Sequence, residues 1–274
     1  FSALLDHGDQ ILMPDPYYAC YPNFVNYIGA EPVYVPLREE EGFILNAEEV
    51  KKKLDGNIKA LMINSPANPT GAVLGEQELR DLAGLNTFIV SDEVYHGINY
   101  KGRDHSILEY TDQAIVINGF SKRNIMTGWR LGYLIAPAGL VRKMQKLQQN
   151  LFICACSFIQ AAGIAALREE EDVLDKRFSA YNERRLYLYR ELGKIGIAPA
   201  KMPDGALYMM ANVKKYTHDS YSFALQILEE AGVAVTPGID FGPGAEGYIR
   251  ISYACSMENL KEGLSRLGKF FGKL

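Results

Sequence analysis

The chain lacks most features that mark a specialised class of protein. Its 274 residues include four cysteines, Cys20, Cys154, Cys156 and Cys255, too few for a disulfide framework in a chain of this length. We expect buried free thiols in a reducing compartment, and therefore a cytoplasmic location. No apolar run reaches the ~18 residues that a membrane-spanning helix needs, so no membrane partner is predicted.

The sequence also has no large excess of one charge and no motif typical of a metal site. The 29 basic and 33 acidic residues leave a formal net charge of −4, and no basic cluster along the chain predicts a nucleic-acid partner. The four histidines are scattered and form no ligand motif, so no metal site is predicted. What the chain does have is 48% hydrophobic residues, which is ample material for a large packed core.

The start of the sequence is unusual, because it begins with Phe1 rather than with methionine. The residues Ala3-Leu4-Leu5 have the composition of the end of a helix. We therefore expect that a preceding stretch of chain is missing from the sequence.

Short apolar segments alternate with polar helical segments over the first two thirds of the chain. This alternation predicts a mostly parallel sheet between helices, a three-layer α/β/α arrangement. The predicted strands cover residues 11–13, 32–37, 60–64, 88–91, 114–118 and 131–136, and two of the helices between them cover residues 47–54 and 75–82.

The last third of the chain has a different pattern. Residues 140–192 are strongly helical and end in one long helix over 168–192, after which a smaller α+β unit follows. We predict a large domain at residues 1–170 and a small domain at 171–274. The small domain has predicted strands at 206–211, 233–236 and 248–253 and predicted helices at 222–231 and 257–271.

Residues 242–247 satisfy the pattern G-x-G-x-x-G of dinucleotide-binding proteins. That interpretation requires a strand before the motif and a helix after it. A predicted strand follows instead, so we interpret the segment as a turn.

Polar side chains follow four of the predicted strands directly. Ligands of open α/β sheets bind at the carboxyl ends of the strands, so these side chains are predicted to share one edge of the sheet. Together they offer aromatic, amide, carboxylate, phenol, hydroxyl and amine groups, a set that suits a flat, charged, phosphorylated cofactor. The segments are Pro14-Asp15-Pro16-Tyr17-Tyr18, Ser65-Pro66-Ala67-Asn68-Pro69-Thr70-Gly71, Ser91-Asp92-Glu93-Val94-Tyr95 and Gly119-Phe120-Ser121-Lys122.

The order and spacing of these segments resemble a known family. With Met126-Thr127-Gly128-Trp129-Arg130-Leu131-Gly132-Tyr133, Pro203-Asp204-Gly205-Ala206-Leu207-Tyr208 and Tyr248-Ile249-Arg250-Ile251-Ser252, they resemble the class I and II aminotransferases of pyridoxal 5′-phosphate (PLP) fold type I. The resemblance covers essentially the whole chain. It implies transfer of an amino group from an L-amino acid (aspartate, alanine or an aromatic one) to a 2-oxo acid such as 2-oxoglutarate. It also implies a homodimer with shared active sites.

The resemblance assigns the residues nearest the chemistry. Lys122 would hold PLP as a Schiff base and then move a proton between substrate and cofactor. Asp92 would face the pyridine nitrogen and keep it protonated, so that the ring accepts electrons. Tyr95 and Asn68 would both bond the phenolate oxygen of PLP. For Asp92, a helix N-cap is the competing interpretation.

The remaining site residues would bind the rest of the cofactor and the substrate. Arg130 would clamp the phosphate with help from Ser121, and Tyr18 would stack on the cofactor ring. Arg250, with Asn68, would bind the α-carboxylate of the substrate; a structural ion pair is the competing interpretation for Arg250. We expect Tyr21 to serve in packing.

Three departures from the family pattern stand out. The stretch that normally precedes Ala3, with a phosphate-binding loop and an arm to the partner subunit, is absent. Residues 83–87 are short, which predicts that residues are lost there as well. Gly119 occupies a position where many family members have a phosphate-binding serine.

Two other functions stay open from the sequence. One is a PLP-dependent C–S β-lyase, which would use the same lysine, aspartate and tyrosine. The other is the aminotransferase-like domain of a transcription regulator. A truncated chain that folds without binding PLP productively is a further possibility.

Overall fold

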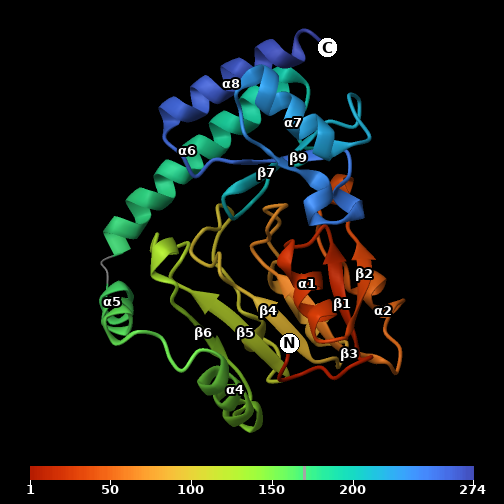
Figure 1. Cartoon of the computed structure of the whole chain (residues 1–274), viewed down its shortest axis with the longest axis vertical. Helices are drawn as coiled ribbons and strands as arrows, with labels where there is room; N and C mark the ends of the chain where they lie inside the picture. Colours follow the sequence, from red (N-terminus) through yellow and green to blue (C-terminus); the bar gives the residue numbers. More distant parts are fainter. Residues whose placement is uncertain (169–170) are drawn as a thin grey trace.

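The computed structural model describes residues 1–168 and 171–274, which form a six-stranded and a three-stranded sheet with helices around both (Figure 1). The larger sheet has the order β2-β1-β3-β4-β5-β6, and the smaller has the order β7-β9-β8. The strands are β1 (Gln10–Asp15), β2 (Glu31–Pro36), β3 (Ile58–Asn64), β4 (Ile89–Asp92), β5 (Ala114–Gly119), β6 (Gly132–Ile135), β7 (Tyr208–Asn212), β8 (Thr236–Pro237) and β9 (Tyr248–Ser252).

The prediction of a mostly parallel sheet is confirmed. Strands β1 to β5 pair in parallel, and only the edge strand β6 runs antiparallel, against β5. The apolar runs produce this sheet because their alternate side chains are buried on opposite faces. In β3, for example, Leu61 and Ile63 belong to one buried cluster and Ala60 and Met62 to another.

Helices cover both faces of the larger sheet, which gives three layers. The helices of the chain are α1 (Cys20–Tyr27), α2 (Ala47–Lys51), α3 (Glu76–Ala83), α4 (Ala138–Leu151), α5 (Ser157–Leu167), α6 (Glu171–Ile195), α7 (Ser220–Ala231) and α8 (Met257–Phe271). Val25 of α1 packs with Met62, whereas Val50 of α2 and Leu79 of α3 pack with Ile63 on the other face.

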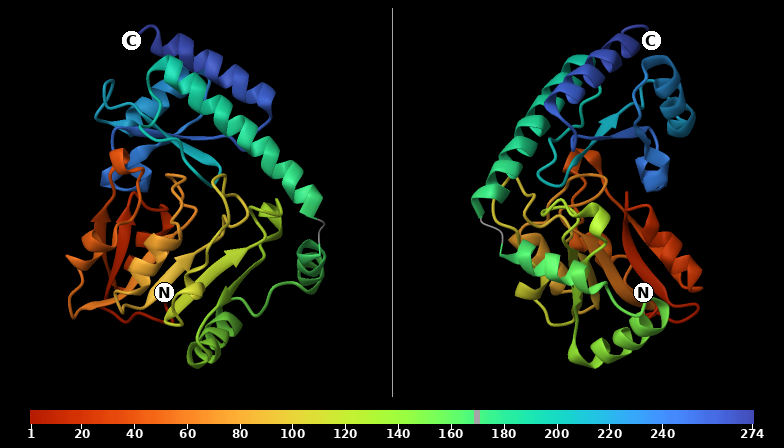
Figure 2. Two further views of the ribbon diagram at one scale, coloured as in Figure 1. Left: turned by 180° about the vertical axis from the view of Figure 1, so that it is seen from behind. Right: turned by 60° about the vertical axis from the view of Figure 1, so that its left-hand side comes forward.

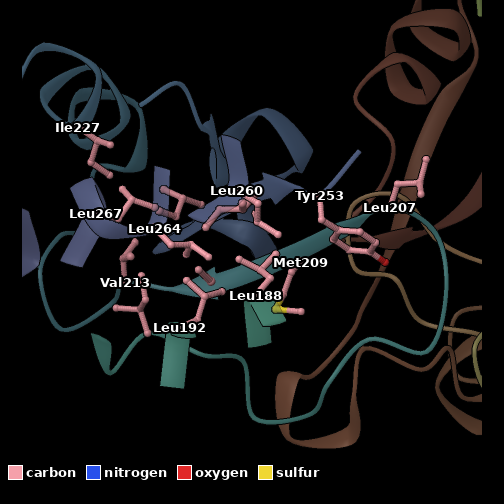
Figure 3. Close-up of a cluster of buried hydrophobic side chains, with 14 of the residues drawn as sticks. Leu188, Leu192, Leu207, Met209, Val213, Ile227, Tyr253, Leu260, Leu264 and Leu267 are labelled. Carbon is pink, nitrogen blue, oxygen red and sulfur yellow. The ribbon is translucent and has the colours of Figure 1, made fainter. Parts of the chain in front are cut away.

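The smaller sheet has its own apolar core between α6, α7 and α8 (Figure 3). Leu188 and Leu192 of α6 and Leu264 of α8 meet Met209 of β7, and all four side chains are at least 95% buried. The long helix α6 runs from the region of the larger sheet to this core (Figure 2).

Several predicted boundaries differ from the structure. Residues 2–4 form a turn and not a helix, and the Leu4 and Leu5 N–H groups donate to the Phe1 carbonyl. The helix predicted over 47–54 ends at Lys51. Of the strand predicted over 233–236, only Thr236 belongs to a strand, β8, which continues to Pro237. Helix α1 was not predicted, because its eight residues contain Pro22 and no long apolar pattern.

The helical region predicted over 140–192 is divided into three helices, of which α6 is the long one. The predicted domain boundary lies between residues 170 and 171. Residues 169 and 170 lie outside the described residues, so the boundary stays a prediction. The helix predicted from residue 168 is wrong at its start, because Arg168 caps the end of α5 and α6 is described from Glu171. No helix in the described ranges is both long and apolar enough to cross a membrane.

One side of the molecule leaves apolar side chains open to solvent. In β6, Tyr133, Leu134 and Ile135 are all 45–49% exposed, and after α4 Phe152 is 72% exposed. The prediction that the cysteines are buried is wrong. They are free, but Cys154 and Cys156 are exposed because they lie in this segment between α4 and α5, and Cys20 and Cys255 are only partly buried.

Candidate active site

The predicted site residues gather at the carboxyl ends of four neighbouring strands. Tyr18 follows β1, Asn68 follows β3, Asp92 ends β4, and Ser121 and Lys122 follow β5. The smaller sheet faces this edge (Figure 1). Two backbone contacts hold it there, since the Tyr17 N–H donates to the Phe241 carbonyl at 2.9 Å and the Gly244 N–H donates to the Asp15 carboxylate at 3.0 Å.

Asp92 accepts one hydrogen bond on each carboxylate oxygen. The Tyr21 hydroxyl donates to Oδ2 at 2.6 Å, and the Val94 N–H donates to Oδ1 at 3.1 Å. Burial raises the pKa of Asp92, while these two hydrogen bonds, then the nearby charges of His96 and Lys122, lower it. No helix begins after Asp92, so the N-cap interpretation is wrong. Tyr21 also packs in a buried apolar cluster, as predicted, and its hydroxyl contact with Asp92 was not predicted.

Tyr95 lies between Lys122 and Tyr208 of the smaller sheet. The Tyr95 hydroxyl donates to the Tyr208 hydroxyl at 2.9 Å, and Lys122 Nζ lies 5.5 Å from the centre of the Tyr95 ring. Burial, reinforced by Tyr208, raises the pKa of Tyr95 far above its ordinary value. Its hydroxyl therefore stays protonated and can donate a hydrogen bond.

Arg250 reaches the same edge from β9. One terminal nitrogen donates to Asn68 Oδ1 at 2.8 Å and the other to Thr236 Oγ1 at 3.1 Å. The guanidinium carbon lies 4.2 Å from the centre of the Tyr208 ring and 4.6 Å from that of Phe241. Burial lowers the pKa of Arg250.

Arg250 is a largely enclosed cation that lacks an anion. Within residues 1–168 and 171–274, Arg250 forms no ion pair, and its Nε is buried without a hydrogen-bond partner. The competing interpretation, a structural ion pair, therefore has no carboxylate at ion-pair distance in this part of the chain, although the charge of Asp240 raises the pKa of Arg250 from farther away. A buried charge of this kind is stabilised by an anion from outside, such as a carboxylate.

The predicted phosphate-binding residues are less enclosed. Ser121 and Lys122 are partly buried, whereas Arg130 is exposed and donates from Nη1 to the Thr127 carbonyl at 2.8 Å. Arg130 has a φ of 54°, in the left-handed region that non-glycine residues seldom adopt, where it ends a short 3-10 helix at Thr127–Trp129.

The structure explains the glycine at position 119. A Cβ atom there would lie 3.0 Å from the Leu131 carbonyl oxygen and 3.1 Å from Gly132 Cα, because β5 and β6 approach closely at this point. A side chain at position 119 would therefore require the backbone of residues 131 and 132 to shift by a few tenths of an ångström.

A large cleft of the described chain lies elsewhere. It has a volume of about 710 Å³, is lined by polar loops such as 40–46 and 99–105, and contains none of the predicted site residues. Chemical composition, and not cavity size, therefore locates the candidate site.

A model of the family described as aminotransferase class I and II matches residues 1–267. The chain belongs to the class I and II aminotransferases. This aminotransferase is 40% identical to a probable N-acetyl-LL-diaminopimelate aminotransferase of Bacillus subtilis over 98% of this chain and 70% of that protein. It is 39% identical to an aspartate aminotransferase of Pyrococcus abyssi over 98% of this chain and 71% of that one.

Solved aminotransferase structures match the fold closely. An aromatic aminotransferase from Pyrococcus horikoshii superposes with a TM-score of 0.95 at 37% identity, over 99% of this chain and 75% of the other. The aspartate aminotransferase of Thermus thermophilus with maleate has a TM-score of 0.93 at 35% identity, over 97% of this chain and 71% of the other. These matches confirm the predicted fold class.

Two residues that contact the candidate site were not assigned to it from the sequence. Tyr21 lies three residues after Tyr18, a spacing that places both side chains on one side of a helical turn. Tyr208 ends a motif that the resemblance included, but no role was assigned to it. In both cases the signal was a tyrosine beside a predicted site residue.

Proposed function

We propose that this aminotransferase uses PLP to move the amino group of an L-amino acid, such as aspartate, alanine or an aromatic amino acid, to a 2-oxo acid such as 2-oxoglutarate. The observation that best supports the proposal is that Asp92, Lys122 and the unpaired cation Arg250 face one edge of the sheet. When bound, PLP supplies a ring that accepts the negative charge developing at the substrate Cα.

The residues present fit this cofactor. The Asp92 carboxylate lies in the field of Lys122 and can hold a proton on a ring nitrogen. Tyr95 carries a protonated hydroxyl, and Asn68 keeps its Nδ2 group as a donor because its Oδ1 accepts from Arg250. Both therefore suit an anionic ring oxygen.

The other groups bind and orient. Arg250 pairs with the α-carboxylate of the substrate, which gives its enclosed guanidinium the anion it lacks. Lys122 Nζ moves the proton at the substrate Cα. Tyr18, 37% exposed, offers its ring for stacking, and Ser121 and Arg130 hold the phosphate.

The identity of the amino-group donor is a separate question from its binding by Arg250. The relatives carry names for aspartate, aromatic and N-acetyl-LL-diaminopimelate substrates. Arg250 addresses the α-carboxylate that all of these donors share. Because the Thermus thermophilus enzyme was solved with maleate, maleate is a useful competitor for distinguishing acidic from aromatic donors.

The proposal includes a homodimer with shared active sites. Exposed apolar side chains on β6, α4 and α5 support it, since large apolar patches mark interaction surfaces. They include Leu134, Leu151, Phe152, Ile153, Phe158 and Leu167, at 46–78% exposure. Light scattering should give twice the chain mass for the wild type, and Phe152→Ser with Phe158→Ser should lower it. A wild-type mass of one chain would contradict the dimer.

An absorbance spectrum tests the activity. The protein with PLP should show a visible band that is lost in Lys122→Ala, is kept in the control Lys101→Ala, and bleaches when a donor amino acid is added. Lys101 is a suitable control because it is exposed and pairs with Asp204. A band in Lys122→Ala equal to that of the wild type would overturn the proposal. Pyruvate and sulfide released from a cysteine conjugate without added oxo acid would point to a lyase instead.

A further inference from the structure

The tyrosine next to Asp92 has a polar contact that packing alone does not explain. Tyr21 is 5% exposed and its ring belongs to the apolar cluster that joins α1 to the sheet, with Val25, Met13 and Met62. Its hydroxyl is the one polar atom of the side chain, and it points to Asp92 Oδ2 at 2.6 Å. Helix α1 thus brings a donor from one face of the sheet to the carboxylate at the end of β4.

The direction of this hydrogen bond follows from the surroundings. Burial, then the charge of Asp92 and the hydrogen bond to it, raise the pKa of Tyr21 well above its ordinary value. The proton therefore stays on Tyr21, and the carboxylate is the acceptor. Hydrogen bonds from a hydroxyl to an ionised acceptor are short and about twice as strong as neutral ones.

We propose that Tyr21 is a positioning residue for the reaction proposed above, which holds Asp92 Oδ2 in place and keeps the Asp92 carboxylate ionised toward the cofactor edge. The inference rests on the proposed function for its purpose, but the contact itself can be tested without cofactor.

The groups around Asp92 make Tyr21 the decisive donor. Burial raises the pKa of Asp92, and the Tyr21 hydrogen bond is the strongest of the influences that lower it, ahead of the Val94 N–H. Without the hydroxyl, burial would favour the neutral acid, which cannot hold a proton on a ring nitrogen. The titratable groups that face Asp92 are Tyr18, Tyr21, Tyr95, His96 and Lys122.

The same helical turn also orients Tyr18. The rings of Tyr18 and Tyr21 meet edge to face with their centres 5.2 Å apart, and the Tyr21 N–H donates to the Tyr18 carbonyl at 3.0 Å. One turn therefore sets both the ring proposed to stack on the cofactor and the hydroxyl that holds the carboxylate. Movement of either side chain affects the other.

A second tyrosine of the chain provides a matched control. Tyr248 is 2% exposed, and its hydroxyl donates to Glu39 Oε2 at 2.7 Å. This pair has the same chemistry as Tyr21 and Asp92, but Glu39 also accepts from Asn212 and the Ala200 N–H, away from the candidate site. Loss of the Tyr248 hydroxyl should therefore affect stability alone.

The first experiment measures Asp92 in protein without PLP. Protein with ¹³C-labelled aspartate is titrated by NMR in the wild type, Tyr21→Phe and Tyr248→Phe, and Asp92→Asn assigns the signal. Tyr21→Phe keeps the ring and should shift the protonation equilibrium of Asp92 toward the acid by roughly tenfold or more. Tyr248→Phe should leave it unchanged.

The second experiment uses the enzyme loaded with PLP. Tyr21→Phe should lower kcat by roughly ten- to a hundredfold with little change in the donor KM, and should move the acidic limb of the pH profile to higher pH. In the Asp92→Asn background, Tyr21→Phe should add almost nothing, because Tyr21 acts through Asp92. If Tyr21→Phe instead impaired folding, it would lower kcat in the Asp92→Asn background as well, so the comparison separates the two causes.

Two results would overturn the inference. One is an Asp92 titration in Tyr21→Phe that equals the wild type, and the other is a full additive loss of kcat in the Asp92→Asn background. A wild-type protein with no PLP band would overturn the proposed function instead, while the titration without cofactor would still decide the contact between Tyr21 and Asp92.

Discussion

The two halves of the six-stranded sheet enclose the candidate site to very different degrees. At the ends of β1, β3 and β4, Tyr21, Asn68 and Tyr95 are 5%, 7% and 3% exposed, and each makes a side-chain hydrogen bond. At β5 and β6, Arg130 is exposed and Leu134 is 46% exposed. The part of the site proposed to hold the cofactor ring is therefore preorganised within this chain, whereas the part proposed to hold the phosphate is open to solvent.

The two edges of the sheet show the same contrast. At the β2 edge, Pro32 and Pro36 occupy the strand, and proline blunts an edge because it has no N–H to donate. Strand β6 at the other edge has no proline and exposes all four of its residues. The chain protects one edge by itself and leaves the other suited to a further partner, in line with the proposed dimer.

The largest expected effect tests this contrast through stability. Ile63→Ala in β3 should lower the free energy of unfolding by about 2–5 kcal/mol, because Ile63 is fully buried and the substitution leaves a cavity. Leu134→Ala in β6 should cost roughly 0.5 kcal/mol or less in the monomer. Denaturant unfolding at several protein concentrations measures both. A cost for Leu134→Ala that matches Ile63→Ala at high dilution would show that β6 is covered within a single chain.

The next effect compares the two ends of the site by activity. Asp92→Asn keeps the shape of the side chain but removes the charge, and should lower kcat/KM on the order of 10²–10³-fold. Arg130→Lys keeps the charge at an exposed position and should cost roughly tenfold, mainly in PLP affinity. Steady-state kinetics at rising PLP concentration separate the two, since added PLP should rescue Arg130→Lys only. Equal losses that PLP does not rescue would remove the distinction.

Much of this arrangement could be predicted from local sequence, because buried strands appear as short apolar runs and the residues after them share one sheet edge. That reasoning located Asn68, Asp92 and Lys122. It could not find the hydrogen bond between Tyr21 and Asp92, which are 71 positions apart, or that between Arg250 and Asn68, 182 positions apart. Such contacts depend on strand order and on how the smaller sheet sits over the larger.

Exposure was the other property that the sequence could not supply. Cys154 and Cys156 lie in an apolar stretch, and apolar stretches are usually buried, yet both thiols are exposed. Periodicity indicates which residues prefer to be buried but not whether another surface is present to bury them. On the β6 side, apolar residues that prefer burial are therefore exposed.

The smallest effect concerns the pH dependence of stability. Burial raises the pKa of Asp92 in the folded protein above its ordinary value. Without PLP, the stability linked to this group is therefore present below the unfolded pKa of about 4 and is lost as the pH rises through the folded value. Asp92→Asn removes that loss.

At neutral pH, Asp92→Asn without PLP should melt higher than the wild type by about 2–4 °C, and the difference should disappear in acid. The control Asp112→Asn changes an exposed aspartate before β5 and should melt like the wild type at every pH. Calorimetry across the pH range measures all three proteins. A lower melting temperature for Asp92→Asn at neutral pH would mean that the hydrogen bonds from Tyr21 and Val94 stabilise the charged carboxylate by more than burial destabilises it. The charge of Asp92 would then not lower the stability of the folded protein.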